Sequence, residues 1–444
     1  MLNANNEEMA LMPWAEKWTG LVPYILKRGL VFQDGKQMIQ LANYEDLLSL
    51  EGTFWIDEKN QLLHIHPFEN KNPNECAYDL TNQEQLFVPK NIGTNYIHVS
   101  GFIFEHAANG FPRIGTGAVF VNGCHHGLFE NNVIRNINSV GIEAGARTKE
   151  KKVSSNEENE RVENHPGGFI IRNNEIYNCG TGGIQGHTVR NSLLEKNHLH
   201  HIGWQHAEQY WECAAIKMLR NVNNVVAHNS VHDVNEASGI WLDWDNRNSR
   251  VTGNLLYNIG RTSNGAIFIE ASIVPNMVDN NIIWGANGPG ISLYDTDDAN
   301  VCYNLVAFTE TPVSSRVNTN RSLNGVPLTS KNNIVNFNIF YQNSELPVIQ
   351  DSENISNKNI FVSSDLNEWQ KSGFDKESKS LEMTISFAEH NQMLIIESEI
   401  PLPEVTNSLP CTDDFWGKER LTEKTIPAPW QMNMTGLSNF RLNK

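Results

Sequence analysis

The sequence has few basic residues and no segment typical of a membrane protein. Its 34 Lys and Arg residues are outnumbered by 51 Asp and Glu residues, so the formal net charge at pH 7 is −17. An acidic surface repels phosphate backbones, and we therefore expect no nucleic-acid partner. No apolar run approaches membrane-spanning length, and we expect no membrane span.

The start of the chain lacks the signature of a secretory signal peptide. The residues MLNANNEEMALMPW contain neither a basic n-region nor an apolar h-region. If Met1 is the native start, this predicts a cytoplasmic protein. A trimmed start would leave a periplasmic or secreted location open.

Cysteine motifs are also absent. Six cysteines are present and no two have C-x-x-C spacing, so the sequence predicts no zinc or redox motif and favours buried free thiols. His125 and His126 are adjacent, but no acidic residue stands at ligand spacing from them. We expect no metal site and no cofactor. The cysteines are Cys76, Cys124, Cys179, Cys213, Cys302 and Cys411.

What the sequence does contain is a short repeated pattern. Gly or Ala precedes an aliphatic residue, and about ten residues later an Asn precedes further apolar residues. Successive Asn positions lie 23 to 27 residues apart in the regular part of the chain, for example 23 from Asn174 to Asn197. The aliphatic positions are Val119, Ile142, Ile184, Ile216, Ile240, Ile267 and Ile291. The Asn positions are Asn132, Asn174, Asn197, Asn229, Asn254, Asn281, Asn304 and Asn338, with Asn359 as a further candidate.

This period predicts an all-β protein, a right-handed parallel β-helix with little helical structure. Each coil would bury its apolar residues against the coils on either side. Asn at a corner tolerates left-handed backbone geometry and can bond to the Asn of the next coil. Two intervals are long. The excess in Arg147–Gly168 is charged and predicts a surface loop, and GWQHAEQYWEC at 203–213 predicts a wall beside a groove.

The pattern divides the chain into three parts. Residues 1–90 form an N-terminal segment in which GTFWIDEKNQLLHIHPF predicts a β-hairpin around a DEKN turn. Residues 91–362 carry the repeat and form the predicted catalytic core. Residues 363–444 predict a tail that packs along the helix and covers its open end.

Strand alternation then sorts the side chains into columns. With the aliphatic position facing inward, the residue two places on is also inward, which gives Met218, Leu242, Ile269 and Leu293 in consecutive coils. The residues one and three places on would face solvent. These outward columns contain Lys217, Trp241 and Phe268 in one, and His187, Asp243 and Glu270 in the other.

Asp243 and Glu270 occupy the same outward column in consecutive coils. Adjacent strands lie about 4.7–4.9 Å apart, so the two carboxyl groups are expected about 5 Å from each other. Retaining glycosidases hold their two carboxyl groups about 5–5.5 Å apart, whereas inverting enzymes need about 6.5–9.5 Å. The aromatic residues beside them, Trp241 and Trp244, favour a site over a plain solvated surface.

Three segments are distinctive: WECAAIKML (Trp211–Leu219), SGIWLDWD (Ser238–Asp245) and GAIFIEAS…PNMVDNNI (Gly265–Ile282). Together they resemble the β-xylosidases of glycoside hydrolase family 120, and the resemblance covers about residues 30–310. It implies that Asp243, in the G-I-W-x-D-W segment, is the nucleophile. It implies that Glu270, in the F-x-E segment, is the acid/base, and that Glu212 lies in the pocket.

Further residues are predicted to bind the substrate. Lys217 lies one coil before Asp243, where it would orient a carboxylate or bond to the substrate, or else form a plain salt bridge. Trp241 and Trp244 are candidates for stacking on a sugar. The remaining candidates are His187 in the acid column, His206 and Glu208 on the aromatic segment, and His106 in FEHAANGF.

The leading hypothesis is a retaining, β-xylosidase-like glycoside hydrolase acting on plant or algal oligosaccharides, and a homo-oligomer is compatible with it. The alternative is a polysaccharide lyase or uronate epimerase, which would need a base and cationic groups around a uronate; Lys217 and Arg220 are the basic residues available. A third class, a non-catalytic carbohydrate-binding adhesin, would show aromatic residues without a close acid pair. Fold alone does not separate the three classes.

Overall fold

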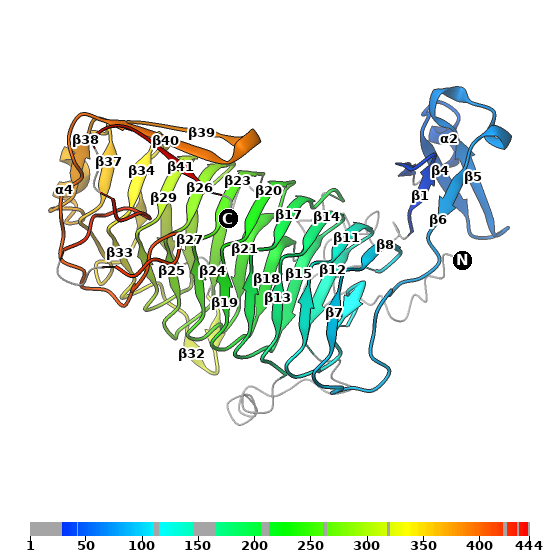
Figure 1. The fold of residues 1–444 in the computed structure, drawn as a ribbon, viewed down its shortest axis with the longest axis horizontal. Coiled ribbons are helices and arrows are strands. Elements are labelled where there is room, and N and C mark those ends of the chain that lie inside the picture. The colour runs from blue at the N-terminus through cyan, green and yellow to red at the C-terminus, as the bar shows by residue number, and fades with distance from the viewer. Residues whose placement is uncertain are drawn as a thin grey trace.

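The computed structural model describes residues 29–41, 43–110, 115–145, 166–205, 213–260, 264–317, 320–420, 424–432 and 435–442. Within these ranges the chain is almost entirely β-structure, and an elongated stack of coils forms most of its length (Figure 1). No helix in the described ranges has both the length and the apolar character needed to cross a membrane.

Three long sheets run along the stack in the described part of the chain, and each coil contributes one strand to each sheet in the order first, second, third. All neighbours within them are parallel. The first sheet contains β7 (His98–Ser100), β10 (Leu128–Glu130), β13 (Ile170–Arg172), β16 (Leu193–Glu195), β19 (Val225–Ala227), β22 (Arg250–Thr252), β25 (Met277–Asp279), β28 (Asn300–Cys302), β33 (Ile334–Asn336) and β36 (Ile355–Asn357).

The second sheet contains β8 (Ile103–Ala107), β11 (Val133–Ile137), β14 (Glu175–Cys179), β17 (His198–Ile202), β20 (Ser230–Val234), β23 (Leu255–Ile259), β26 (Ile282–Ala286), β29 (Leu305–Thr309), β34 (Ile339–Tyr341), β37 (Ile360–Val362) and β38 (Lys379–Leu381). The third contains β9 (Val119–Phe120), β12 (Val140–Ala144), β15 (Gly182–His187), β18 (Ala214–Leu219), β21 (Ser238–Asp243), β24 (Ile267–Glu270), β27 (Ile291–Tyr294), β30 (Val313–Arg316) and β35 (Val348–Ile349). This is the parallel β-helix that the repeat predicts.

The repeated asparagines stack at the corner between the first and second sheets, as predicted. The Asn197 side-chain oxygen accepts from both the backbone N–H and the side-chain amide of Asn174, at 3.1 and 3.0 Å. Asn197 in turn donates to the oxygen of Asn229 at 3.0 Å. The same bonds continue through every predicted position from Asn132 to Asn359. We call this row the asparagine ladder.

The predicted left-handed geometry at this corner lies one residue earlier than expected. The ladder asparagines do not have positive φ; the residue before each of them does. The ladder side chain must point inward to reach its neighbours, so the chain turns at the preceding position. The residues that precede the ladder asparagines and have positive φ are Asn131, Asn173, Lys196, His228, Gly253, Asn280, Tyr303, Phe337 and Lys358.

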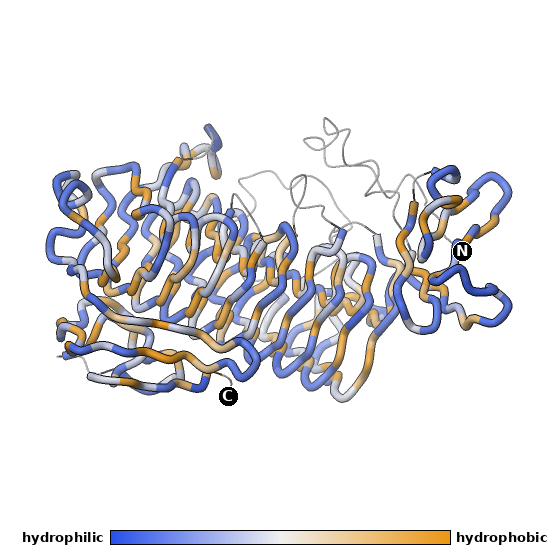
Figure 2. The backbone as a smooth tube through the Cα atoms, turned by 90° about the horizontal axis from the view of Figure 1, so that it is seen from above, coloured by the Kyte–Doolittle hydropathy of each residue, from blue (hydrophilic) through white to orange (hydrophobic). Residues whose placement is uncertain are grey.

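The inward column of the third sheet is confirmed. Met218, Leu242, Ile269 and Leu293 are at most 1% exposed and are paired in series along the stack. They belong to one continuous apolar core that runs from coil to coil. Figure 2 shows the same alternation as orange stretches that recur at matching positions in successive coils.

The N-terminal residues form a small β-structure at one end of the stack (Figure 1). The predicted hairpin is present, since β4 (Thr53–Asp57) pairs antiparallel with β5 (Leu62–His66). The other elements of this part are β1 (Val31–Gln33), β2 (Lys36–Gln37), β3 (Ile39–Gln40), α2 (Tyr44–Leu47) and β6 (Tyr78–Leu80). Most of the predicted surface loop Arg147–Gly168 lies outside the described residues.

The C-terminal residues cover part of the second sheet. After β38 and the short helix α4 (Asn367–Lys371), an antiparallel sheet forms from β39 (Thr384–Ala388), β40 (Met393–Ser398) and β41 (Gly436–Arg441). Its apolar residues pack on the outward residues of β23, β26, β29, β34 and β37. Ion pairs also hold the C-terminal segment against the first sheet. Arg250 of β22 pairs with Asp279 of β25 at 2.6 Å and with Asp413 of the C-terminal segment.

Candidate functional site

The third sheet brings the two predicted acids into neighbouring coils. Asp243 is the last residue of β21 and Glu270 is the last residue of β24. Those strands pair with Trp241 opposite Phe268 and Leu242 opposite Ile269, so the acids occupy the next matching positions. Leu219 precedes them in this column and Tyr294 follows. The predicted register therefore holds.

The prediction that these outward columns face solvent is wrong for four of the named residues, while His187 and Glu270 are partly exposed. Lys217, Trp241, Asp243 and Phe268 are only 3%, 8%, 7% and 2% exposed. The cause is stacking along the column. The Lys217 ammonium lies 3.6 Å from the centre of the Trp241 ring, and the Trp241 and Phe268 rings stack at 5.2 Å. Each side chain of this column thus covers the next, and Lys217 also contacts Asp243 of the neighbouring column.

Asp243 has a fixed cationic partner. The Lys217 ammonium lies 2.8 Å from Asp243 Oδ2. Lys217 is itself sandwiched against Trp241, which also packs on Phe268 from the other side. The two buried groups satisfy each other, because removing either one would leave the other as a buried charge without this partner. Trp241 supports Lys217 in this arrangement.

Glu270 has a different environment. Burial raises the pKa of Glu270 to about 7, and the neighbouring Asp243 charge adds to that shift. The Arg321 guanidinium opposes it from 2.6 Å, and Lys217 opposes it as well. Arg321 also binds the fully buried Asp295 at 2.7 Å, so its position does not depend on Glu270 alone.

Arg321 was not predicted from the sequence. It lies 51 residues after Glu270, beside the small hairpin of β31 (Ser322–Leu323) and β32 (Val326–Pro327). Leu323 and Leu328 pack on Ala271 and Trp244, which holds the hairpin against the end of the acid column. The segment interrupts the repeat, and no periodic signal marks it.

Trp244 and His187, also predicted from the sequence, lie on the same sheet as the acids or directly after one of its strands. Trp244 follows the Asp243 strand, with the Arg321 guanidinium 5.3 Å from its ring. The indole N–H groups of Trp241 and Trp244 are buried and have no hydrogen-bond partner among the described residues. His187 shares the acid column, two coils before Asp243.

His106 is not brought to the acids. It lies on β8 in the second sheet and stacks on Phe32 of the N-terminal part at 4.2 Å. His206, Glu208 and Glu212 lie outside the described residues, so their predicted roles stay predictions. The described centre consists of Asp243, Glu270, Lys217, Trp241, Trp244, Arg321 and Asp295.

This centre can separate the roles of two carboxyl groups. One is ion-paired with an ammonium, while burial and the charge of the first raise the pKa of the other to about 7. Carboxyl pairs with unlike environments supply an acid and a nucleophile or base at the same pH. The indole N–H groups of Trp241 and Trp244, which have no partner in the described part of the chain, add hydrogen-bonding capacity for a polar ligand.

Comparison with known proteins identifies the fold. A family model described as a right-handed β-helix region matches residues 107–306. No curated protein matches the chain. Among solved structures, the complex of XylC with xylose has a TM-score of 0.69 at 20% sequence identity, covering 93% of this chain and 81% of that one. The predicted fold class and the resemblance to family 120 β-xylosidases are thereby confirmed at the level of the fold.

Two further structures are more distant. One described as a glycoside hydrolase has a TM-score of 0.44 at 14% identity, covering 71% of this chain and 57% of that one. The GH136 lacto-N-biosidase from Eubacterium ramulus has a TM-score of 0.37 at 14% identity, covering 61% and 43%.

Proposed function

We propose that this protein is a retaining, β-xylosidase-like glycoside hydrolase that cleaves β-glycosidic bonds of plant or algal oligosaccharides. One observation carries the proposal. Asp243 is ion-paired with Lys217 at 2.8 Å, while burial and Asp243 raise the pKa of its neighbour Glu270 to about 7. The similarity of the fold to XylC, solved with xylose, supports a sugar substrate.

In the first step, a carboxylate oxygen of Asp243 attacks the anomeric carbon. Glu270 donates its proton to the leaving oxygen as the glycosidic bond breaks, which leaves a glycosyl ester on Asp243. In the second step, the Glu270 carboxylate takes a proton from water. The water oxygen attacks the anomeric carbon and releases Asp243 as a carboxylate.

The partners of the two acids suit these steps. Lys217 holds the Asp243 carboxylate in position before attack through the ion pair at 2.8 Å. Arg321 stabilises the Glu270 carboxylate that forms when the proton leaves. The matching positions on adjacent strands support a separation of about 5 Å, the range of double displacement. Lys217 and Arg321 are both paired with the protein's own carboxylates, which favours a hydrolase over a lyase that must neutralise a uronate.

The first prediction tests the two roles separately. A panel of nitrophenyl glycosides, with β-xylosides included, should identify a substrate that the wild type cleaves. Asp243→Ala should abolish turnover of that substrate, since no glycosyl ester can form. Glu270→Ala should slow substrates with poor leaving groups by about 10²–10⁴-fold, because proton donation is lost.

With a good leaving group, Glu270→Ala should still form the glycosyl ester and then stall. Added azide should restore turnover and yield a glycosyl azide with retained configuration. Glu195→Ala, which removes a carboxylate from the first sheet, serves as the matched control and should keep wild-type rates. Near-native activity in both alanine variants would overturn the assignment, and an unsaturated product that absorbs in the ultraviolet would indicate a lyase.

A further inference from the structure

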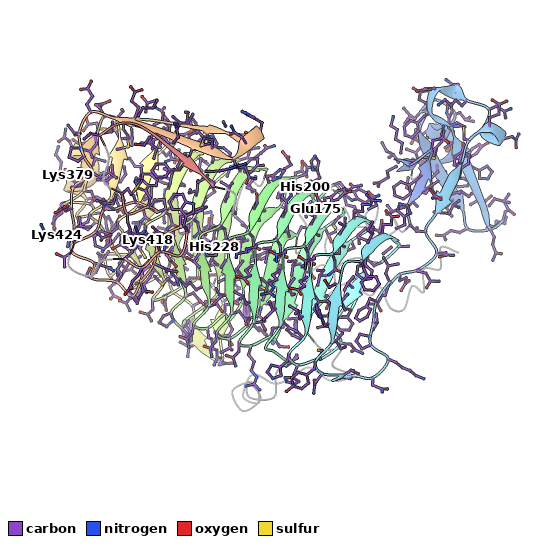
Figure 3. All side chains as sticks on the ribbon, in the orientation of Figure 1. Glu175, His200, His228, Lys379, Lys418 and Lys424 are labelled. Carbon is purple, nitrogen blue, oxygen red and sulfur yellow. The ribbon has the colours of Figure 1, made fainter. Side chains whose placement is uncertain are left out.

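A second group of reactive side chains lies on the second sheet, away from the acids of the third. Glu175 on β14 pairs with His198 on β17, and Tyr177 pairs with His200, which pairs with His232 on β20. All of these side chains point to the same outer face, because they stand two residues apart on each strand. Figure 3 labels Glu175 and His200, which lie close together on the helix.

The rings of this group form a stack. The Tyr177 and His200 rings are 4.8 Å apart, and the His200 and His232 rings are 5.2 Å apart, with interplanar angles of 6°. Tyr257 continues the stack beyond His232 at 4.5 Å. Stacking alone explains why the rings are parallel. It does not explain why their nitrogens converge on a carboxylate.

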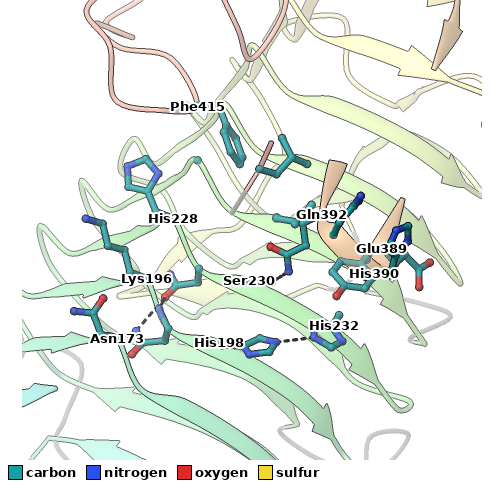
Figure 4. Close-up of a pocket in the computed structure, with 17 residues that line it drawn as sticks. Asn173, Lys196, His198, His228, Ser230, His232, Glu389, His390, Gln392 and Phe415 are labelled. Carbon is teal, nitrogen blue, oxygen red and sulfur yellow. Dashed lines mark hydrogen bonds between the residues drawn. The ribbon is translucent and has the colours of Figure 1, made fainter. Parts of the chain in front are cut away.

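A chain of hydrogen bonds leaves one nitrogen of His198 as an acceptor. His232 Nδ1 lies 2.8 Å from Asp233 Oδ2 and donates a hydrogen bond to that carboxylate. His232 Nε2 is then an acceptor, and it lies 2.8 Å from His198 Nε2, which donates (Figure 4). The proton of neutral His198 is therefore on Nε2, and its Nδ1 carries a free lone pair.

His200 also presents a ring nitrogen toward Glu175. Its Nδ1 lies 2.8 Å from His201 Nδ1, with one proton between them. Its Nε2 is buried and makes no hydrogen bond to any described residue, although Glu175 Oε1 lies 3.5 Å away. In the tautomer in which His200 Nδ1 donates to His201, the lone pair of His200 Nε2 faces the Glu175 carboxylate.

Three lone-pair atoms thus face one another. Glu175 Oε1 lies 3.5 Å from His200 Nε2 and 3.9 Å from His198 Nδ1, and all three atoms lie within 4.8 Å of one another. Tetrahedral zinc with ligands at about 2.0–2.1 Å separates those ligands by about 3.4 Å. The observed spacing is close to that value, and a cation between the atoms would remove their mutual repulsion.

We propose that Glu175, His198 and His200 bind a divalent transition-metal ion, with zinc as the ion whose ligand preferences fit best. His232 and Asp233 form an outer shell that fixes the tautomer of His198, as outer-shell carboxylates do for zinc-binding histidines. Asp233 is in turn held by a hydrogen bond from Asn258.

A cavity gives the ion access from solvent. Its volume is about 520 Å³, and His198 and His232 line one side of it, opposite Glu389 and Gln392 at the tip of the β39–β40 hairpin (Figure 4). Because His198 belongs to both the cavity and the ligand set, the fourth position on zinc is open to water or to a ligand in the cavity.

A second cluster, of two carboxylates and a thiol, is not proposed as a metal site. Asp279, Cys411 and Asp413 also lie within ligand distance of one another. Arg250 already occupies the space between the two carboxylates, at 2.6 Å from Asp279 Oδ2 and in contact with Asp413. A guanidinium there supplies the positive charge that a metal would bring.

The test uses the full chain without an affinity tag, stripped with a chelator and titrated with zinc against a chromophoric competitor. We expect one zinc ion per chain, and cobalt in its place should show the visible absorption of a four-coordinate ion. Asp233→Asn should weaken zinc binding by about 10–100-fold, as outer-shell changes do. Glu175→Gln and His200→Asn should weaken it further.

His390→Gln is the matched control, because His390 lines the same cavity from the hairpin and is not a proposed ligand. It should leave zinc affinity unchanged. Failure of the full chain to bind zinc, or equal affinity in Glu175→Gln and wild type, would overturn the proposal. Nitrogen chemical shifts that place a proton on His200 Nε2 in the metal-free chain would also overturn it. None of these readouts depends on glycosidase activity.

Discussion

Asp243 and Glu270 are chemically similar residues whose neighbours make them different. Lys217 binds Asp243 directly, so that carboxylate has a cation at 2.8 Å. Glu270 also has a cation, Arg321, but burial and the Asp243 charge outweigh it and raise the pKa of Glu270 to about 7. Arg321 therefore limits how far the pKa of Glu270 rises. Substituting Arg321 tests the role of Glu270.

We predict that Arg321→Gln shifts the alkaline limb of the pH profile of kcat/KM to higher pH. The proposed reaction needs protonated Glu270, so the rate falls as the pH rises through the pKa of Glu270. The Arg321 charge favours the ionised form and lowers that pKa. Removing the charge raises the pKa, so the protonated acid persists to higher pH.

The pH profile of kcat/KM on an activated glycoside measures this shift. Arg321→Lys keeps a positive charge and should keep the limb near its wild-type position. Lys331→Gln removes a cation from an exposed ion pair with Glu353 and should not move the limb. An alkaline limb that stays in place or moves to lower pH in Arg321→Gln would show that Glu270 is not the titrating acid.

The sequence predicted the acid pair and placed Lys217, Trp241 and Trp244 beside it, but it did not predict Arg321 or the burial of Lys217 and Trp241. Asp243 and Glu270 follow from the repeat, because strand register fixes which residues share a column. Arg321 and its hairpin lie in an insertion where the repeat gives no register. The burial of Lys217 and Trp241 was missed because alternation says which way a side chain points, not what stacks upon it.

Among the structural elements, the asparagine ladder carries the most regular interactions. Asn254 accepts from the backbone N–H and the side-chain amide of Asn229, and it donates to Asn281 and to the Val226 carbonyl. All of these groups lie inside the corner, where water does not replace a lost partner. Each ladder position therefore satisfies several buried groups at once.

We predict that Asn254→Ala lowers the free energy of unfolding by about 3 kcal/mol or more, since each buried polar group left unsatisfied costs about 1–3 kcal/mol. Chemical denaturation followed by circular dichroism measures the loss. The control is Asn235→Ala, at an exposed corner position after β20, which should change stability by less than about 0.5 kcal/mol. Equal effects in the two variants would mean that the ladder does not stabilise the fold.

The ladder also shows a limit of sequence reasoning at the level of elements. Spacing located the ladder asparagines, but the turn itself falls on the residue before each one. Asn131 and Asn173 at that position suit positive φ, whereas Tyr303 and Phe337 do not by their nature favour it. The hydrogen bonds of the ladder asparagine that follows fix the backbone conformation at the turn. The residue type at the turn therefore does not predict its positive φ.

At the scale of the whole molecule, the C-terminal sheet changes how the coils depend on one another. In a solenoid each coil contacts only its neighbours, so local opening stays local. Here Leu394, Ile396 and Phe440 pack in one cluster with Leu255 of β23, Ile360 of β37 and the coils between them. One segment thereby joins coils that would otherwise be independent. Among the described strands of the second sheet, β14, β17 and β20 lie outside this apolar cluster and carry the histidine group instead.

This coupling leads to a prediction about where the molecule opens. Leu394 is fully buried in the cluster, and Leu394→Ala should cost about 2–5 kcal/mol, as core truncations do. Hydrogen exchange followed by mass spectrometry should then speed up together in β23, β26 and β29, although none of them contains the changed residue. Exchange in β11 should stay at the wild-type rate, because that strand lies outside the cluster.

Ile400→Ala is the control, since Ile400 is 47% exposed and removing its side chain leaves the cluster intact. It should leave the exchange of all these strands unchanged. Faster exchange confined to β39–β41 in Leu394→Ala would mean that the C-terminal sheet opens alone and that the coils do not rely on it. Uniformly faster exchange that includes β11 would mean that the whole β-helix unfolds as one unit. Only a response limited to the covered coils fits a solenoid whose independent repeats are tied together by one segment.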